Sequence, residues 1–279
     1  ADMAGRCRAE VKAIEKPWGE WFSLEELEAA LIQHKPAILA MVHAETSTGV
    51  CQPMEGIGDL CRKHDCLLLL DTVTSLGGVP LYIDDWKVDL SYSCSQKGLS
   101  CPPGLGPFTM GPRAEAKMEA RTGKVPNWYL DVSLLNKYWG SDRVYHHTAP
   151  VNMNFGMREA LRLLAEEGLD QAWARHRRNA EALWTGIENL GLTMHVPYER
   201  RLPTLTTVRI PDGVDGKAFS QYLLNTHGIE VGGGLGSLAG KIWRIGLMGF
   251  NSTPENVNRL LNLFETELPK FSGSTAAAA

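Results

Sequence analysis

Apolar runs that end in a charged or polar side chain most constrain how this chain can fold. The run 67–70 consists of four leucines and ends at Asp71, and the strand-like run near Tyr92 leads to Lys97. A buried-looking strand at 37–42 follows a helix that we expect from Leu24 to about His34, opened by a capping box at Ser23. Another helix is expected to begin at Pro53. Alternating strands and helices predict an α/β fold with a parallel sheet, whose ligand groups gather at the carboxyl ends of the strands.

The second half of the chain has a different pattern. Helices are predicted at 151–167 and 169–190, separated by Gly168, and the second carries a basic face that includes Arg175, His176 and Arg178. Strand and helix patterns then alternate to about 268, which predicts a smaller α+β domain. We therefore expect a large domain at 1–168, a small domain at 169–270 and a tail at 271–279. The segment 101–148 lacks strong periodicity, and we expect a loop-rich surface there that packs against something.

Composition excludes several classes of protein. The 279 residues contain 28 Lys and Arg against 32 Asp and Glu, a net charge of −4, which argues against a nucleic-acid partner. No apolar run approaches the roughly 20 residues that a membrane helix needs, so no membrane span is predicted. The six cysteines have no C-x-x-C spacing and are expected to be reduced core thiols. The start does not resemble a signal peptide, so we expect an intracellular protein that is not secreted.

Asp71 and Lys97 together suggest a pyridoxal phosphate site. A lysine amine can hold the aldehyde of this cofactor as a Schiff base, and an aspartate can keep its pyridine nitrogen protonated. The alternatives are a solvated surface lysine and an aspartate that caps the turn after its strand. His146 and His147 could suggest a metal site, but two adjacent histidines without a third ligand are weak support, and we predict no metal.

Several short blocks, in order along the chain, carry a family resemblance. They are 43–50 (HAETSTGV), 71–78 (DTVTSLGG), 92–97 (YSCSQK), 145–148 (YHHT), 232–236 (GGGLG) and 243–247 (WRIGL). Together they resemble the alanine-glyoxylate (serine-pyruvate) aminotransferase family, which belongs to the class V, fold-type I pyridoxal phosphate enzymes. The resemblance implies a large domain with a mostly parallel sheet and helices on both faces, plus a smaller C-terminal α+β domain.

The resemblance also implies roles for individual residues. Lys97 would form the Schiff base and move the proton, and Asp71 would face the pyridine nitrogen. The other cofactor contacts would come from Val73 on a ring face, Thr46 near the phenolic oxygen, Gln96 on the phosphate, and Tyr145 and Thr148 on the phosphate of a neighbouring subunit. Arg244 would bind the substrate carboxylate, with a structural ion pair as the alternative.

The expected function is transfer of the amino group of alanine or serine to glyoxylate or pyruvate, by a homodimer with shared active sites. With this function we expect small amino acid and keto acid substrates and a role in glyoxylate metabolism. We also expect a location in the cytoplasm, peroxisome or mitochondrion. The alternatives are a 3-hydroxykynurenine transaminase and a cysteine desulfurase, for which Cys101 is the candidate residue. The family's Ser-Gly-x-Gly phosphate loop and stacking aromatic residue would lie upstream of Ala1 and are not in this sequence. A truncated homologue that serves as a structural or interaction subunit is therefore another alternative.

Overall fold

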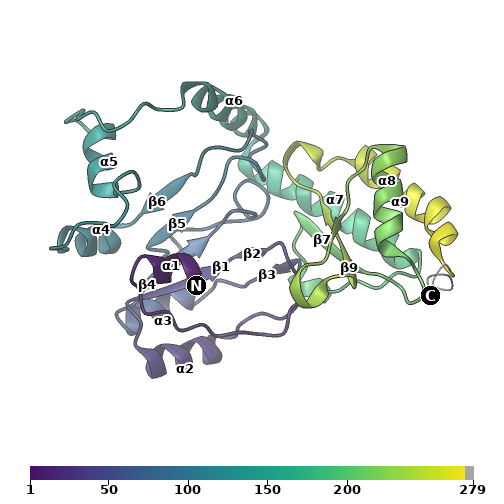
Figure 1. Cartoon of the computed structure of the whole chain (residues 1–279), viewed down its shortest axis with the longest axis horizontal. Coiled ribbons are helices and arrows are strands. Elements are labelled where there is room, and N and C mark those ends of the chain that lie inside the picture. Colours follow the sequence, from purple (N-terminus) through teal and green to yellow (C-terminus); the bar gives the residue numbers. More distant parts are fainter. Residues whose placement is uncertain (274–279) are drawn as a thin grey trace.

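The computed structural model describes residues 1–273, and two main sheets and a short two-stranded antiparallel sheet organise it (Figure 1). Up to residue 167 the elements are α1 (Asp2–Arg6), α2 (Leu24–His34), β1 (Ile38–Val42), β2 (Ala44–Glu45), β3 (Val50–Cys51), α3 (Ile57–Lys63), β4 (Leu67–Asp71), β5 (Leu90–Tyr92), β6 (Phe108–Met110), α4 (Pro112–Glu119), α5 (Val132–Trp139) and α6 (Val151–Glu167). The larger sheet has the order β1-β4-β5-β6. Its first three strands are parallel and β6 is antiparallel to β5.

Helices α2 and α3 cover one face of this larger sheet. Their apolar side chains pack with the strand residues that point toward them, among them Leu68 and Leu70 of β4. The predicted capping box at the start of α2 is confirmed: Glu26 N donates to Ser23 Oγ, and Ser23 N donates to the Glu26 carboxylate at 2.9 Å. The helix expected from Pro53 begins only at Ile57, because Gly56 adopts a left-handed conformation (φ 83°) immediately before it.

The strand expected to be buried at 37–42 is only half-buried, so that expectation was wrong. Strand β1 lies at the edge of the sheet, and its residues alternate between exposed and half-buried. Leu39 and Met41 pack toward α2 and α3, whereas Ile38 and Val42 are exposed on the opposite face. The run of apolar residues does not reveal this, because a buried strand and a half-exposed edge strand can both be uniformly apolar.

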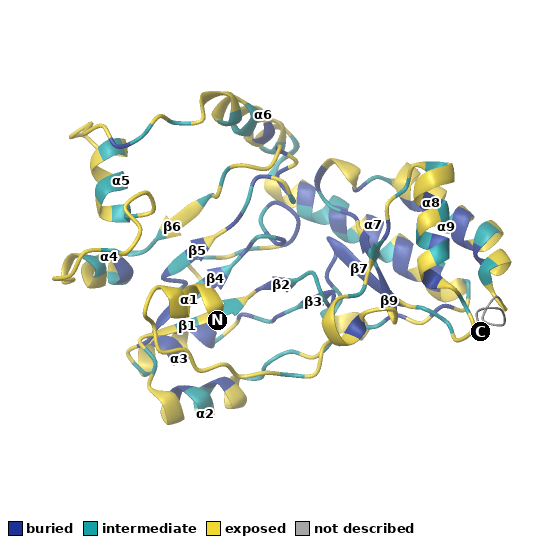
Figure 2. Cartoon of the chain, viewed as in Figure 1, coloured by how far each residue is buried: buried dark blue, intermediate teal, exposed yellow. Residues whose placement is uncertain are grey.

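The smaller sheet has the order β7-β9-β8 and is antiparallel. From residue 169 the elements are α7 (Leu169–Asn189), η1 (Tyr198–Arg200), β7 (Leu205–Arg209), α8 (Gly216–His227), β8 (Gly232–Gly233), η2 (Gly236–Leu238), β9 (Ile242–Gly246), η3 (Gly249–Asn251), α9 (Pro254–Glu267) and η4 (Leu268–Phe271). The side chains of Trp184, Phe219, Trp243 and Phe264 are fully buried in its core. Figure 2 shows this concentration of buried residues between the small sheet and α7 to α9.

The two tryptophans of this core keep their polar atoms satisfied. Trp184 Nε1 donates to Thr206 Oγ1 at 2.8 Å, and Trp243 Nε1 donates to the carbonyl of Gly216 at 3.0 Å. A buried indole N–H without a partner would offset part of the gain from burying the ring. The core therefore combines large apolar rings with complete hydrogen bonding.

The two sheets are joined by side chains that reach across. Thr204 Oγ1 donates to Thr74 O at 3.2 Å, and Thr207 Oγ1 donates to Thr48 O at 2.8 Å. His176, which we expected on an exposed basic face, is instead fully buried, and its Nε2 accepts a hydrogen bond from Gly249 N at 2.8 Å. Burial lowers the pKa of His176, so the ring is neutral and contributes no positive charge to α7.

The ends of the predicted domains can be compared with these elements. Gly168 separates α6 from α7, but the domain boundary placed there stays a prediction. Phe271, in the expected tail, packs against Phe219 with 5.4 Å between ring centroids. The rest of the expected tail from residue 274 lies outside the described residues. Among the helices within residues 1–273, none combines the length and the apolar character needed to cross a membrane.

Candidate active site

Asp71 is the last residue of β4, and two hydrogen bonds fix its carboxylate. Oδ1 accepts from Val73 N at 2.8 Å, and Oδ2 accepts from the Tyr92 hydroxyl at 2.7 Å. Val42, Asp71 and Tyr92 are in register across three parallel strands, so their side chains point to the same face of the sheet. This is the face that α2 and α3 leave uncovered. The carboxylate is therefore oriented toward an accessible surface at the carboxyl end of the sheet.

Tyr92 is a site residue that the sequence analysis quoted within a motif but gave no role. Burial, and then the hydrogen bond to Asp71, raise the pKa of its hydroxyl to about 12, so it stays protonated and donates. Ala40, Val42, Leu69, Asp71 and Tyr92 line a hollow of about 130 Å³ beside the carboxylate. The contact between Tyr92 and Asp71 follows from the register of β4 with β5. It could not be predicted, because the sequence does not give the register between strands.

The turn that carries Lys97 is held against the loop that follows Asp71. Ser95 Oγ donates to Pro102 O at 2.7 Å, and Ser100 N donates to Lys97 O at 2.9 Å. A Cβ added to Gly98 would lie 2.3 Å from the carbonyl oxygen of Leu76, so only glycine permits this approach. Lys97 and Asp71 therefore sit on two segments that pack directly together.

Two side-chain hydroxyl groups also join the residue after Asp71 to the end of β5. Thr72 Oγ1 donates to Tyr92 O at 2.9 Å, and Ser93 Oγ donates to Thr72 O at 3.0 Å. Lys97 is half-buried, and within residues 1–273 it forms no ion pair or side-chain hydrogen bond. Within the described residues, no carboxylate therefore pairs with the Lys97 amine.

Thr46, in the turn between β2 and β3, and Arg244 of β9 approach each other. Arg244 NH1 donates to Thr46 O at 3.3 Å, while its Nε donates to Gly233 O at 2.7 Å. The Thr46 turn is tight: Gly49 has φ 80°, and a Cβ there would lie 2.7 Å from Thr207 Oγ1. No carboxylate in the described residues pairs with Arg244, so the structural ion pair considered for it is not found there.

The remaining predicted residues differ in placement. Val73, two residues after Asp71, is half-buried, and Gln96 is exposed beside Lys97. Tyr145 and Thr148 hydrogen-bond to each other at 3.1 Å on the exposed connection between α5 and α6. That connection lies away from β4 in Figure 1, so the structure does not bring this pair next to Asp71 within one chain. Cys101, the desulfurase candidate, is buried at 4% exposure.

His146 and His147 are engaged with neighbouring side chains. His146 stacks on Trp128 with 3.9 Å between ring centroids, and its Nδ1 lies 2.9 Å from Nδ1 of His147. In the part of the chain that the structure describes, no group of three or more His, Cys, Asp or Glu residues could hold a metal ion. Stacking and local hydrogen bonds are sufficient to account for both rings.

Comparison with known proteins follows the same order of blocks. Residues 1–260 match the family model described as aminotransferase class V. Alanine–glyoxylate aminotransferase of Mus musculus is 44% identical over 264 residues, which cover 93% of this chain and 64% of that protein. The chain thus spans less than two thirds of the length of this curated relative.

Two solved structures have the same fold over nearly the whole chain. Alanine–glyoxylate aminotransferase from Nostoc sp. has 65% sequence identity and a TM-score of 0.93, covering 95% of this chain and 70% of that one. Ureidoglycine–glyoxylate aminotransferase from Bacillus subtilis has 39% identity and a TM-score of 0.94, covering 97% and 70%. These comparisons confirm the predicted fold class and the resemblance, and they establish that the chain belongs to the class V aminotransferase family.

Proposed function

We propose that the protein represented by this chain is a pyridoxal phosphate-dependent aminotransferase that moves the amino group of alanine, or of serine, to glyoxylate or pyruvate. The observation that carries the proposal is the packing of two segments at one sheet edge, one ending in an oriented carboxylate (Asp71) and the other bearing an unpaired amine (Lys97). Family membership and the similarity to alanine–glyoxylate aminotransferases support it. The expected location in the cytoplasm or an organelle stays a prediction.

The side chains at this site suit pyridoxal phosphate. Asp71 would be the anionic group for the pyridine nitrogen and Lys97 the amine for the aldehyde, and Thr46, Val73 and Gln96 are proposed as further cofactor contacts. When bound, the cofactor supplies an electron sink for the bond that breaks at the donor's α-carbon. The chain's own residues orient the Asp71 carboxylate through the Val73 amide and the Tyr92 hydroxyl, and they would present the Lys97 amine to remove and return the α-proton.

Arg244 is proposed to position the substrate. Its Nε and NH1 are used on the carbonyls of Gly233 and Thr46, which leaves NH2 and part of the fork for an incoming carboxylate. Since the Thr46 carbonyl anchors this guanidinium, the substrate carboxylate would be held close to the cofactor region. A small donor such as alanine fits a site in which the arginine is tied down on two sides.

A homodimer is proposed as the working form. Trp128, Tyr129, Trp139, Tyr145 and Phe155 are each at least half-exposed on the α5 and α6 region, and exposed aromatic patches of this kind mark interaction surfaces. Tyr145 and Thr148 lie on this region and would reach the site of the neighbouring subunit. Analytical ultracentrifugation of the full protein should give a dimer that the substitution Trp139→Asp shifts toward monomer.

The test uses the 279-residue chain with added pyridoxal phosphate. Borohydride should fix one equivalent of cofactor onto Lys97, located by peptide mass spectrometry, and alanine with glyoxylate should yield pyruvate. Lys97→Ala should abolish both results, while Lys117→Ala, an exposed lysine on α4, should leave both intact. Labelling elsewhere, or pyruvate formation that survives Lys97→Ala, would refute the proposal. Serine in place of alanine compares the two donors.

A further inference from the structure

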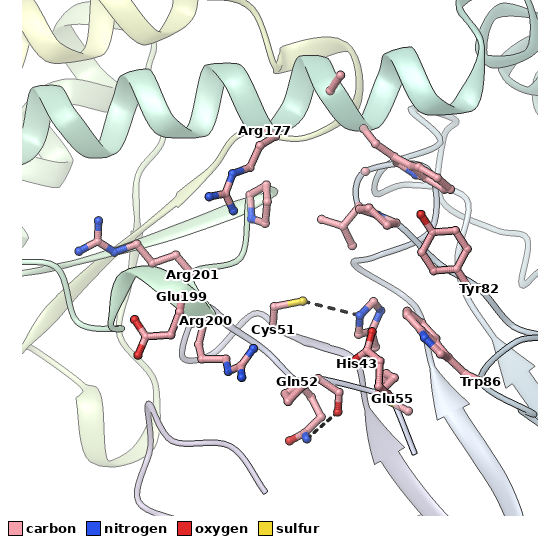
Figure 3. A pocket seen from close by; sticks show the side chains of 18 of the residues that line it. His43, Cys51, Gln52, Glu55, Tyr82, Trp86, Arg177, Glu199, Arg200 and Arg201 are labelled. Carbon is pink, nitrogen blue, oxygen red and sulfur yellow. Dashed lines mark hydrogen bonds between the residues drawn. The ribbon is translucent and has the colours of Figure 1, made fainter. Parts of the chain in front are cut away.

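A second cavity lies between segments from before and after Gly168, and neither Asp71 nor Lys97 lines it. It has a volume of about 570 Å³, and we call it the junction cavity (Figure 3). Its walls include His43, Tyr82 and Trp86 from the large domain and Trp173, Arg177 and Arg200 from beyond Gly168. None of the residues assigned to cofactor or substrate above lines it. Its size is in the range of small-molecule sites, roughly 300–1,000 Å³.

One wall of the junction cavity is a chain of aromatic rings. His43 and Trp86 meet edge to face with 5.1 Å between centroids, Trp86 meets Tyr82 at 5.6 Å, and Tyr82 meets Trp173 at 5.8 Å. Figure 3 shows Tyr82, Trp86 and His43 gathered on one side and the arginines on the other. Aromatic walls favour a ligand with a flat apolar body.

Three buried polar atoms of this cavity have no partner. His43 Nδ1, Trp173 Nε1 and Arg200 Nε are each inaccessible and unpaired within the residues that the structure describes. His43 is 4% exposed, and its other nitrogen lies 3.6 Å from Cys51 Sγ. Buried polar atoms without hydrogen-bond partners are rare in folded proteins, because the loss of water is not compensated. The N–H groups of Trp173 and Arg200, with the unpaired ring nitrogen of His43 beside them, point to a bound group that supplies polar partners.

Arg200 differs from the two other arginines of the cavity. Arg177 Nε donates to Glu181 at 2.5 Å, and Arg201 donates to Glu188 at 2.6 Å. Arg200 has no carboxylate partner in residues 1–273, and its guanidinium lies 5.1 Å from the centroid of the Trp21 ring. A guanidinium that is neither paired nor fully solvated is suited to a carboxylate ligand.

The charge around the opening limits what that ligand can be. Glu55, Asp170 and Glu199 also line the cavity, and all three residues are exposed. Exposed carboxylates are screened by water and salt, but they oppose the entry of a ligand with several negative charges. The pKa of His43 is lowered to about 4 by burial, so this ring adds no positive charge to attract a second anionic group.

We propose that the junction cavity binds a small, flat monocarboxylate, with the carboxylate on Arg200 and the ring against Tyr82, Trp86 and Trp173. The site is separate from the cofactor site and does not depend on the proposed transamination. Because its walls come from both domains, the ligand also links them.

Benzoate is the probe, measured by isothermal titration calorimetry on the 279-residue chain. Saturable 1:1 binding is expected, and Arg200→Gln should weaken it at least tenfold. The same change at Arg178, an exposed arginine on α7 outside the cavity, should have no effect. Benzamide, which lacks the charge, and phthalate, which carries two, should both bind more weakly than benzoate.

Two further variants keep the test decisive if Arg200→Gln disturbs folding. Trp173→Phe retains the ring but removes the unpaired N–H, and it should weaken benzoate binding severalfold with an unchanged circular dichroism spectrum. Lys97→Ala should bind benzoate normally, because Lys97 does not line the cavity. Absence of saturable binding, equal affinity in Arg200→Gln or Trp173→Phe, or loss of binding in Lys97→Ala would each overturn the proposal.

Discussion

The two sheets of this chain are protected to different degrees. In the small domain four residues of β7 are buried and helices α7 to α9 enclose the core, whereas β1 in the large domain alternates between exposed and half-buried residues. Asp71 and Tyr92 lie on the open face of the larger sheet. We infer that apolar packing around the smaller sheet supplies much of the stability, whereas the carboxyl end of the larger sheet presents the polar side chains that we propose as the active site.

The largest effect is expected from the small-domain core. Phe219 is fully buried and meets Trp243 and Phe264 edge to face at 5.5 and 5.1 Å. Phe219→Ala should lower the free energy of unfolding by about 3–5 kcal/mol, measured by urea denaturation with circular dichroism. Phe250→Ala, which removes a ring that is 82% exposed, should change it by roughly 0.5 kcal/mol or less. Equal losses in the two variants would contradict the view that the buried core supplies the stability.

The next largest effect concerns how the free energy of unfolding depends on pH through His43. Folded His43 has a pKa of about 4, below its ordinary value of 6.5, so the unfolded chain binds its proton first as the pH falls. The stabilisation that comes from keeping His43 neutral is therefore complete above pH 6.5. As the pH falls from 6.5 to 4, the free energy of unfolding decreases by up to about 3 kcal/mol. His43→Phe should flatten the dependence of unfolding free energy on pH in that window. The pKa of His176 is also lowered, so the unfolding free energy of His43→Phe should still depend on pH to some extent. If the pH dependence is the same as in the unmodified chain, then the assignment to His43 is wrong.

In the larger sheet, the buried hydrogen bonds of Asp89 are expected to contribute more to the free energy of unfolding than an exposed ion pair does. Asp89 is 3% exposed, and its Oδ2 accepts from Leu68 N and from Arg113 NH1, each at 2.9 Å. Asp89→Ala should destabilise the protein by about 2–3 kcal/mol, because both donors lose their acceptor. Asp59→Ala removes an exposed pair with Lys87 and should cost about 0.5 kcal/mol or less. Urea denaturation of both variants decides whether polar links secure this sheet.

The sequence predicted those features that depend on local signals. The capping box at Ser23 and the break at Gly168 were located correctly, because each is determined by a few neighbouring residues. The sequence also placed Asp71 correctly at the end of a strand, whereas Lys97, expected at the end of the next strand, lies in a turn after β5 ends at Tyr92. It did not predict the open face of β1, the contact of Tyr92 with Asp71 or the unpaired Arg200, because these depend on strand register and on packing between distant segments.

The smallest effect tests the polar edge itself. Tyr92→Phe removes the hydroxyl that donates to Asp71 but keeps the ring, and since Tyr92 is 40% exposed, water can replace part of the lost bond. The unfolding free energy should therefore fall by roughly 1 kcal/mol or less, while borohydride labelling of Lys97 should weaken because the carboxylate is less well oriented. Tyr129→Phe, at a tyrosine that is 51% exposed, serves as the control for both measurements. If labelling is unchanged in Tyr92→Phe, then the Val73 amide alone orients Asp71, and the open face needs only the backbone to hold its carboxylate.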